Sequence, residues 1–285
     1  MGMKASNAIA TFFKYLVLIL VGLIMIYPLL WMVSATFKDN SEIFAGIGLW
    51  IKNPTLEGYK NALNNFGGSI NILQAMLNTY SYVIPKVICT VVSACIAAYG
   101  FGRFDFPGRK LLFNIMLATL FLPQVVLNVP QYLLYNKFGW VDSPFYLAIW
   151  VHCAFATETY FVYQLVQFMR NVPRDLDEAA AIDGCSSFQT LYKVIVPMLG
   201  PALVSCALFQ FMWSCNDFMG PLLYVSTPGK YPMSLFVKLS MDGDTGFAWN
   251  KILALSLISI LPQLIVFFCA QDQFVEGISA GAVKG

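Results

Sequence analysis

The sequence predicts an all-α membrane protein that crosses a bilayer six times. Of its 285 residues, 58% are hydrophobic and 11% are charged, whereas soluble domains carry about 25% charged residues. Six apolar runs are long enough to be membrane helices, because about 20 residues at 1.5 Å rise each cross a hydrocarbon core about 30 Å thick. We expect residues 1–285 to form a single transmembrane domain. Its spans are predicted at about 15–37, 80–101, 111–134, 145–166, 199–219 and 252–270.

The first run, residues 15–37, has a second interpretation as a secretory signal. Lys4 and Lys14 precede it, and Val33-Ser34-Ala35 resembles a cleavage site. The apolar part of a signal is only about 7 to 15 residues long. The length of the run therefore favours a retained span.

The short connection between the second and third runs predicts the orientation. It contains Arg103, Arg109 and Lys110, and basic residues in short loops stay in the cytoplasm. With six spans, both termini then lie in the cytoplasm. Two longer segments, 38–77 and 221–250, fall on the outer side. They are rich in Gly, Pro, Asn and Asp, which is typical of surface structure, and we expect them to be available to an external partner.

Several of the predicted spans contain proline and amide side chains. Proline removes a backbone hydrogen bond and favours a kink. Amides are costly against lipid, so we expect them to face other helices or an aqueous cavity. The sequence alone leaves helix pairing and substrate contact open. The residues concerned are Pro28, Pro85, Pro123, Pro130, Pro262, Gln124, Asn128, Gln131 and Gln263.

Four ionisable residues fall at membrane depth: Lys86, His152, Glu158 and Asp217. Charges inside a membrane are costly and mark candidate functional sites. His152 and Glu158 are six positions apart, which is not one face of a continuous helix, so we do not expect them to pair. Lys86 either pairs with Glu158 or extends toward a membrane boundary. The predicted translocation path consists of Glu158, Gln124, Asn128, Asn216 and Asp217.

The polar loop at 170–197, between the fourth and fifth runs, is predicted to form two short helices. Pro173 suits a first helical turn, and Asp175, Asp177 and Glu178 favour the positive end of a helix dipole. Gly184 is expected to stop the first helix. Ser186 and Gln189 have the spacing of a capping box that starts the second helix, and Pro197 marks the entry to the next span.

Other classes of site find little support in the sequence. The seven cysteines include no Cys-x-x-Cys pair and His152 is the single histidine, so neither a disulfide framework nor a metal site is predicted. The net charge of +2 and the lack of a basic, aromatic patch argue against nucleic acid. Gly229-Lys230 is followed by Tyr231 rather than by Ser or Thr, so there is no phosphate-binding loop. We expect no catalytic residue and no cofactor in this chain.

Four stretches resemble one protein family. Glu178-Ala179-Ala180, Gly184 and the Val194-x-Val196-Pro197 ending are similar to the EAA loop of ABC-transporter membrane subunits. Residues 97–109, AAYGFGRFDFPGR, are similar to the stretch after the second span of carbohydrate-uptake (CUT1-type) permeases, the maltose-permease G-subunit family. Similarity extends to the end of the fifth span and to the tail at 277–285. The matching positions near the fifth span are Trp213, Asn216, Asp217, Phe218, Pro221 and Leu222.

This resemblance implies a type I ABC importer permease fold in the cytoplasmic membrane of a bacterium or archaeon. The implied partners are a second homologous permease subunit, two cytoplasmic ATPase subunits that bind ATP and Mg²⁺, and an extracytoplasmic solute-binding protein that delivers a sugar. ATP-driven closure of the ATPase subunits would then push on the 170–197 loop. The residues implied to couple to the ATPase are Glu178, Ala179, Ala180, Asp183, Gly184 and Pro197.

Three alternatives stay open from the sequence. A membrane-embedded enzyme would use His152, Glu158 and Asp217 as acid and base groups. An ion-coupled carrier or channel would use Lys86 and Glu158 as coupling charges. An ABC importer of a sugar phosphate, such as glycerol 3-phosphate, would use Lys86 as the counter-charge.

Overall fold

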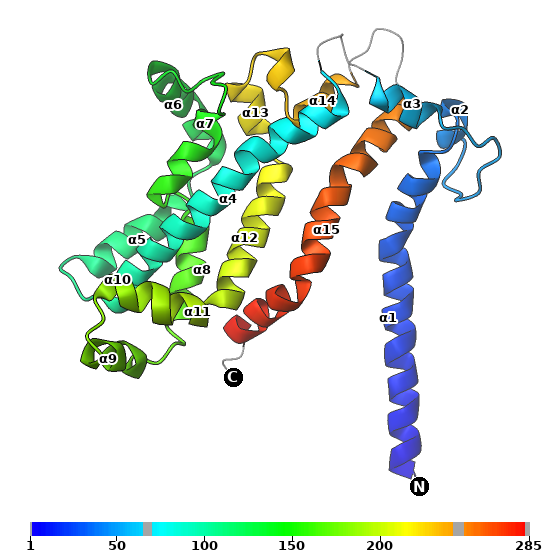
Figure 1. Ribbon diagram of the computed structural model, residues 1–285. Coiled ribbons are helices and arrows are strands. Elements are labelled where there is room, and N and C mark those ends of the chain that lie inside the picture. The colour runs from blue at the N-terminus through cyan, green and yellow to red at the C-terminus, as the bar shows by residue number, and fades with distance from the viewer. Residues whose placement is uncertain (1, 65–69, 242–247, 283–285) are drawn as a thin grey trace. The chain divides into compact units, whose positions relative to one another are not determined.

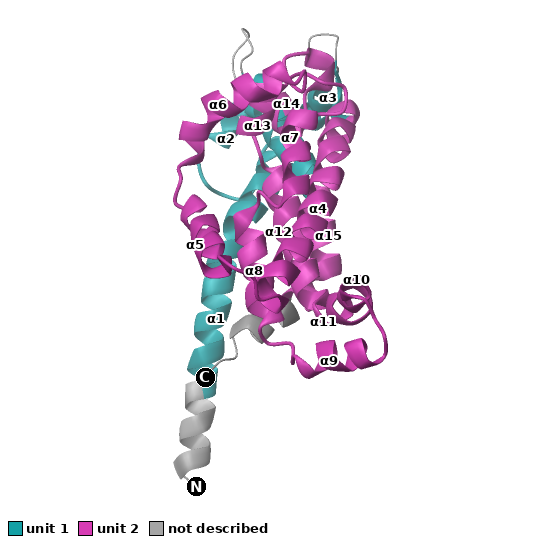
Figure 2. Cartoon of the chain, turned by 90° about the vertical axis from the view of Figure 1, so that its left-hand side faces the viewer, with its two compact units in different colours: residues 1–72, 237–260 teal, residues 73–236, 261–285 magenta. Residues whose placement is uncertain are grey.

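The computed structural model describes residues 2–64, 70–241 and 248–282. The regular elements in these ranges are all helices (Figure 1), which confirms the predicted all-α class. The chain divides into two compact units (Figure 2). One unit comprises residues 1–72 and 237–260, and the other comprises residues 73–236 and 261–285. Of the predicted features, the end of the tail (residues 283–285) and part of each outer segment (residues 65–69 and 242–247) lie outside the described residues.

The first unit contains α1 (Gly2–Ala35), α2 (Asn40–Ile43), α3 (Glu57–Leu63) and the start of α15 (Trp249–Ala282). Helix α3 meets α15 at Gly58, where a Cβ atom would lie 2.7 Å from the carbonyl oxygen of Asn250. The backbone N–H of Asn250 also donates to Oδ1 of Asn40 at 3.0 Å. Only glycine at position 58 permits this close approach.

The second unit begins with α4 and continues through a series of shorter helices. Their bounds are α4 (Ile72–Arg103), α5 (Arg109–Thr119), α6 (Gln124–Lys137), α7 (Leu147–Trp150), the 3₁₀ turn η1 (Val151–Phe155), α8 (Thr159–Met169), α9 (Asp175–Ile182), α10 (Ser187–Thr190), the π-helical turn η2 (Leu191–Ile195), α11 (Val196–Met198), α12 (Gly200–Cys215), α13 (Met219–Tyr224), the 3₁₀ turn η3 (Pro228–Lys230) and α14 (Met233–Leu239), which runs across the unit boundary.

Three helices among the described residues are long and apolar enough to cross a membrane, at Thr11–Ala35, Ile72–Arg103 and Trp249–Phe274. Two bent pairs raise this number to five if each pair is one span. Helices α5 and α6 meet at 99°, and the Ser187–Met198 segment meets α12 at 80°. Pro123 caps α6 at the first bend, and Pro197 lies just before the second. These helices correspond to five of the six predicted spans, and the count of six stays a prediction.

The predicted fourth span, 145–166, is not one continuous helix. After α7 and η1, Ala156 adopts a left-handed backbone with φ 55°, and Thr157 and Glu158 are not helical before α8 begins at Thr159. A left-handed residue cannot continue a right-handed helix. The chain is therefore redirected within an apolar stretch whose composition gives no sign of the break.

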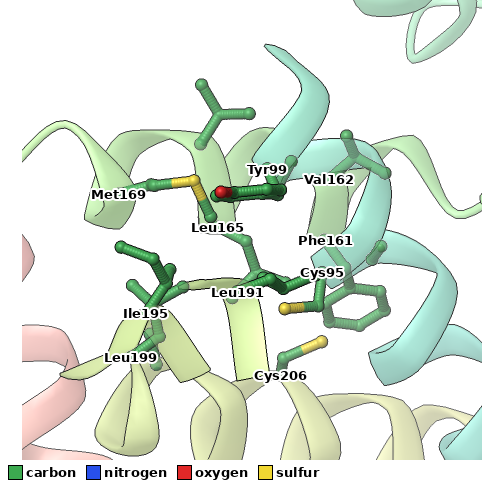
Figure 3. Close-up of a cluster of buried hydrophobic side chains, with 14 of the residues drawn as sticks. Cys95, Tyr99, Phe161, Val162, Leu165, Met169, Leu191, Ile195, Leu199 and Cys206 are labelled. Carbon is green, nitrogen blue, oxygen red and sulfur yellow. The ribbon is translucent and has the colours of Figure 1, made fainter. Parts of the chain in front are cut away.

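The main hydrophobic core of the second unit forms around α8. One face of this helix, with Phe161, Leu165 and Met169 at intervals of four, is fully buried. It packs against α4 and against residues from η2 to α12 (Figure 3). At Gly102 of α4, a Cβ atom would lie 2.8 Å from Sδ of Met169. The core therefore joins α4 and α8 to the end of the 170–197 loop and to α12.

Candidate functional site

The first helix of the 170–197 loop has the predicted form. Helix α9 carries Asp175, Asp177 and Glu178 in its first turn, where acidic groups complement the helix dipole. It stops before Gly184, whose φ of 77° is a left-handed conformation that glycine adopts at little cost. Pro173 differs from the prediction, because it lies before the first helical residue instead of within the first turn.

The second helix of the loop begins with a complete capping box. The Ser186 hydroxyl accepts from the N–H of Gln189 at 3.3 Å, and the Gln189 side chain accepts from the N–H of Ser186 at 2.8 Å. This confirms the predicted cap. The π-helical turn η2 then leads into α11 and Pro197.

The predicted coupling residues differ in exposure. Glu178, Ala179, Asp183, Gly184 and Pro197 are exposed. Ala180 is instead buried, with 6% of its surface exposed. The exposed face of the loop also carries large apolar groups, because Ile182 is 85% exposed and Phe188 is 67% exposed. Large apolar side chains exposed beside acidic ones are typical of a surface that binds another protein.

Arg103 at the end of α4 attaches α9 to the rest of the second unit. Its Nε lies 3.2 Å from Oδ2 of Asp177, and its guanidinium donates to the carbonyl of Val172 at 3.0 Å. The Arg103 side chain is only 6% exposed. The pair therefore links two of the stretches on which the sequence similarity rests, a long-range contact that the sequence analysis missed.

Most of the predicted translocation path lines one cavity of about 690 Å³ within the second unit. Gln124, Asn128, Glu158 and Asp217 all contribute to its wall. The amides lie on α6, Glu158 precedes α8, and Asp217 precedes α13. Further polar and aromatic lining residues are Lys86, Thr119, Gln131, Tyr135, His152, Thr157, Thr159, Tyr160 and Tyr224.

Asn216 is not among the residues that line this cavity. Its side-chain amide donates to the carbonyl of Met212 at 2.8 Å and to Oε1 of Gln263 at 3.0 Å. Asn216 thus bonds α12 to α15 within the second unit. The cavity brings together the other four predicted path residues and leaves this one out.

His152 and Glu158 lie close together, which corrects the expectation that they would not pair. Nε2 of His152 is 4.0 Å from Oε1 of Glu158, and Sγ of Cys153 is 3.5 Å from the same oxygen. The expectation assumed a continuous helix, whereas the break at Ala156 folds the chain back on itself locally. Lys86 lines the same cavity, but no ion pair within 4.0 Å joins it to Glu158 in the described part of the chain.

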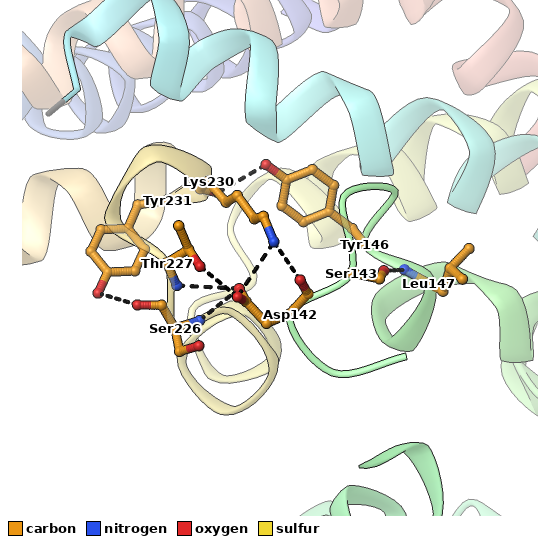
Figure 4. Close-up of polar contacts among 8 residues, drawn as sticks. All are labelled: Asp142, Ser143, Tyr146, Leu147, Ser226, Thr227, Lys230 and Tyr231. Carbon is orange, nitrogen blue, oxygen red and sulfur yellow. Dashed lines mark hydrogen bonds and ion pairs between the residues drawn. The ribbon is translucent and has the colours of Figure 1, made fainter. Parts of the chain in front are cut away.

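Asp142, in the connection between α6 and α7, holds two loops of the predicted outer side together (Figure 4). Its carboxylate accepts from the backbone N–H groups of Ser226 and Thr227 at 3.1 and 3.2 Å, and from the Thr227 hydroxyl at 2.5 Å. Nζ of Lys230 lies 3.4 Å from Oδ2. Burial alone would raise the pKa of Asp142, but the hydrogen bonds, led by those from Thr227, lower it to about 2.

The chain matches one protein family over most of its length. Residues 90–277 match the model of the binding-protein-dependent transport system inner membrane component. This region includes the cavity-lining helices after α4 and the whole 170–197 loop.

Curated relatives with similar sequences are permease proteins. The trehalose/maltose transport system permease protein MalG of Thermococcus litoralis is 30% identical over 94% of this chain and 94% of its own length. The alpha-glucoside transport system permease protein AglG of Rhizobium meliloti is 33% identical over 81% of this chain and 60% of its own length.

A solved structure has the same fold. A chain of a bacterial ABC transporter involved in the import of the acidic polysaccharide alginate superposes with a TM-score of 0.78. The match covers 94% of this chain and 98% of that chain, at 19% sequence identity.

Proposed function

The chain belongs to the family of binding-protein-dependent transport system inner membrane components, and we propose that it is the permease subunit of an importer for neutral oligosaccharides. Its fold is that of type I ABC importer permeases. The family match is the observation that carries the proposal. It favours an importer over the membrane-embedded enzyme and the ion-coupled carrier.

The chemistry of the cavity supports an oligosaccharide substrate. Its wall combines the amides of Gln124, Asn128 and Gln131 with the rings of Tyr135 and Tyr160. Amides bond sugar hydroxyls, and aromatic rings cover the apolar faces of sugar rings. The wall carries one basic side chain, Lys86, and two carboxylates, Glu158 and Asp217. Positive charge therefore does not dominate the cavity. This balance favours neutral sugars over sugar phosphates.

The 170–197 loop is proposed to receive force from ATPase subunits. Glu178 and Asp183 would meet basic groups of an ATPase, with Ile182 and Phe188 as apolar contacts. Movement of α9 would pass through the Arg103–Asp177 pair to α4, and through the bend at Pro197 to α12. Both helices belong to the unit that contains the cavity, so a rigid-body shift could alternate access to it.

The proposed assembly has the partners that the resemblance implies: a second permease subunit, two ATPase subunits that bind ATP and Mg²⁺, and an extracytoplasmic binding protein. Both termini are proposed to lie in the cytoplasm. Cysteine-accessibility labelling of the exposed loop residue Ser187, changed to cysteine, tests this orientation. Labelling from the outer side would contradict it.

Reconstitution of the complete transporter tests the function. We expect uptake of a neutral oligosaccharide into proteoliposomes to require ATP inside and binding protein outside, and to be inhibited by vanadate. Uptake driven by an ion gradient without ATP would contradict the importer. Preferred uptake of a sugar phosphate over maltose-type sugars would contradict the substrate class and leave the importer intact.

A further inference from the structure

Three metal-binding types of side chain meet at the wall of the cavity, although they do not have the spacing of a known metal motif. The donor atoms of His152, Cys153 and Glu158 all lie within 4.8 Å of one another. Sγ of Cys153 and Nε2 of His152 are 3.5 and 4.0 Å from Oε1 of Glu158. A tetrahedral zinc ion with bonds of about 2.0–2.3 Å brings its donors to within about 3.3–3.6 Å of one another. Small side-chain rotations therefore suffice to close the site.

The backbone around these donors is held in place. The Ser93 hydroxyl of α4 donates to the carbonyl of Cys153 at 2.6 Å, and the Thr157 hydroxyl donates to the carbonyl of His152 at 3.0 Å. Cys153 itself is fully buried. A site whose backbone is fixed in advance loses little entropy on binding an ion.

The donors are also accessible to an ion and have bonding capacity left. His152 and Glu158 line the cavity, and their side chains are 27% and 29% exposed. Nε2 of His152 faces Glu158 at 4.0 Å, and the imidazole also interacts with the backbone of Ala148, so Nε2 is the ring nitrogen that an ion would bind. An ion entering the cavity would thus reach the histidine and the carboxylate first, with the thiol behind them.

We propose that His152, Cys153 and Glu158 form a site for a thiophilic divalent cation of the zinc class, with its fourth position open to the cavity. Sulfur, imidazole and carboxylate together select zinc and cadmium over magnesium and calcium, which prefer oxygen alone. This inference goes beyond the proposed transport function and does not depend on it.

Binding to this site is coupled to a proton. The ion forms a bond to the sulfur of Cys153, the S–H bond breaks, and the proton passes to water. One thiolate and one carboxylate then balance the two charges of the cation, while Lys86 on the same wall opposes binding.

Cadmium binding to the purified complete transporter tests the site, because the bond between cadmium and a thiolate gives an ultraviolet absorption band. The exposed Cys269 is first changed to alanine to lower the background. We expect one cadmium ion per chain with this band, displaced by zinc. Cys153→Ala should abolish the band, and His152→Ala and Glu158→Gln should each weaken the affinity at least tenfold.

Cys206→Ala is the matched control, because Cys206 is also fully buried but lies in the core around α8. Its cadmium titration should equal that of the parent chain. If Cys153→Ala does not assemble, Glu158→Gln carries the test, since its side chain reaches the cavity surface. A band that persists in Cys153→Ala, an affinity unchanged in Glu158→Gln, or no band in the parent chain would overturn the proposal.

Discussion

Nε of Arg103 lies 3.2 Å from Oδ2 of Asp177, so the last residue of α4 and the acidic first turn of α9 are joined by an ion pair. With the two side chains 6% and 24% exposed, water screens this pair much less than a surface pair. Helix α9, which is proposed to meet an ATPase subunit, is thereby attached to a helix of the cavity wall.

Arg103→Gln is expected to lower ATP-driven uptake by about tenfold or more, while ATP hydrolysis becomes less dependent on binding protein. The change removes the charge that attracts Asp177 of α9 and the charged donor to the carbonyl of Val172 just before α9, and a hydrogen bond from a charged group contributes about 1.5–3 kcal/mol. Uptake and stimulated ATPase activity are measured on the same proteoliposomes. Arg109→Gln is the matched control, because its partner Asp105 is 79% exposed and exposed pairs contribute only about 0–1 kcal/mol. Equal effects of the two changes would contradict the link.

Gly184→Val is expected to abolish coupled uptake while the chain still inserts and assembles. A Cβ at Gly184 would meet nothing within 4 Å, so the cost comes from its φ of 77°, about 1–2 kcal/mol or more for a β-branched residue. Gly184→Asn should retain most of the activity, because asparagine tolerates this conformation. Expression is checked by immunoblotting of membranes. Full uptake by Gly184→Val would remove the role assigned to this turn.

Asp142→Asn is expected to loosen the two loops that Asp142 connects and to lower their stability by about 1–2 kcal/mol, because charge-assisted bonds are replaced by neutral ones. Asparagine tolerates the left-handed backbone at this position, where φ is 52°, so strain does not add to the effect. Limited proteolysis of the 224–231 loop in proteoliposomes measures it. Protease sensitivity equal to that of the parent would contradict the prediction.

The same contact predicts a pH dependence. The pKa of Asp142 falls from 3.8 to about 2 in the folded protein, so its contribution is fully present above pH 4 and is lost as the pH falls through 2. The difference in stability between Asp142→Asn and the parent should therefore be constant from pH 5 to pH 8. A difference that shrank across this range would show that another group controls the contact.

Asn128→Leu is expected to raise KM for the oligosaccharide delivered by the binding protein, with a smaller effect on the maximal rate. Its amide lines the cavity, and loss of one bond to a neutral group costs about 0.5–1.5 kcal/mol. Asn216→Leu is the comparison, because that amide bonds Met212 and Gln263 instead. It should lower thermal stability and leave KM unchanged. The reverse pattern would place the path elsewhere.

Local signals in the sequence predict the parts of the fold that depend on near neighbours. The stop at Gly184 and the capping box of Ser186 and Gln189 each depend on a few adjacent residues, and both are confirmed. The long apolar runs at α1, α4 and α15 likewise predict uninterrupted helices.

Features that depend on tertiary contacts were missed. The meeting of His152 with Glu158 requires the break at Ala156, a residue type that normally favours helix. The contacts of Arg103 with Asp177 and of Asp142 with Thr227 join segments distant in the chain, and periodicity carries no information about such pairs. The place of Asn216 on the path stays a prediction: its amide bonds Met212 and Gln263 and does not line the cavity, and side-chain type alone does not tell which way an amide points.

The corner between α9 and α10 has a consequence for how such subunits evolve. Its shape is set within residues 184–189, by one glycine and two reciprocal cap bonds. Because these bonds lie within the corner itself, we expect the segment to keep its shape when it is exchanged between related permeases, without changes in the surrounding helices. If α9 and α10 meet an ATPase subunit as proposed, exchange of this corner would alter that contact and leave the cavity wall unchanged.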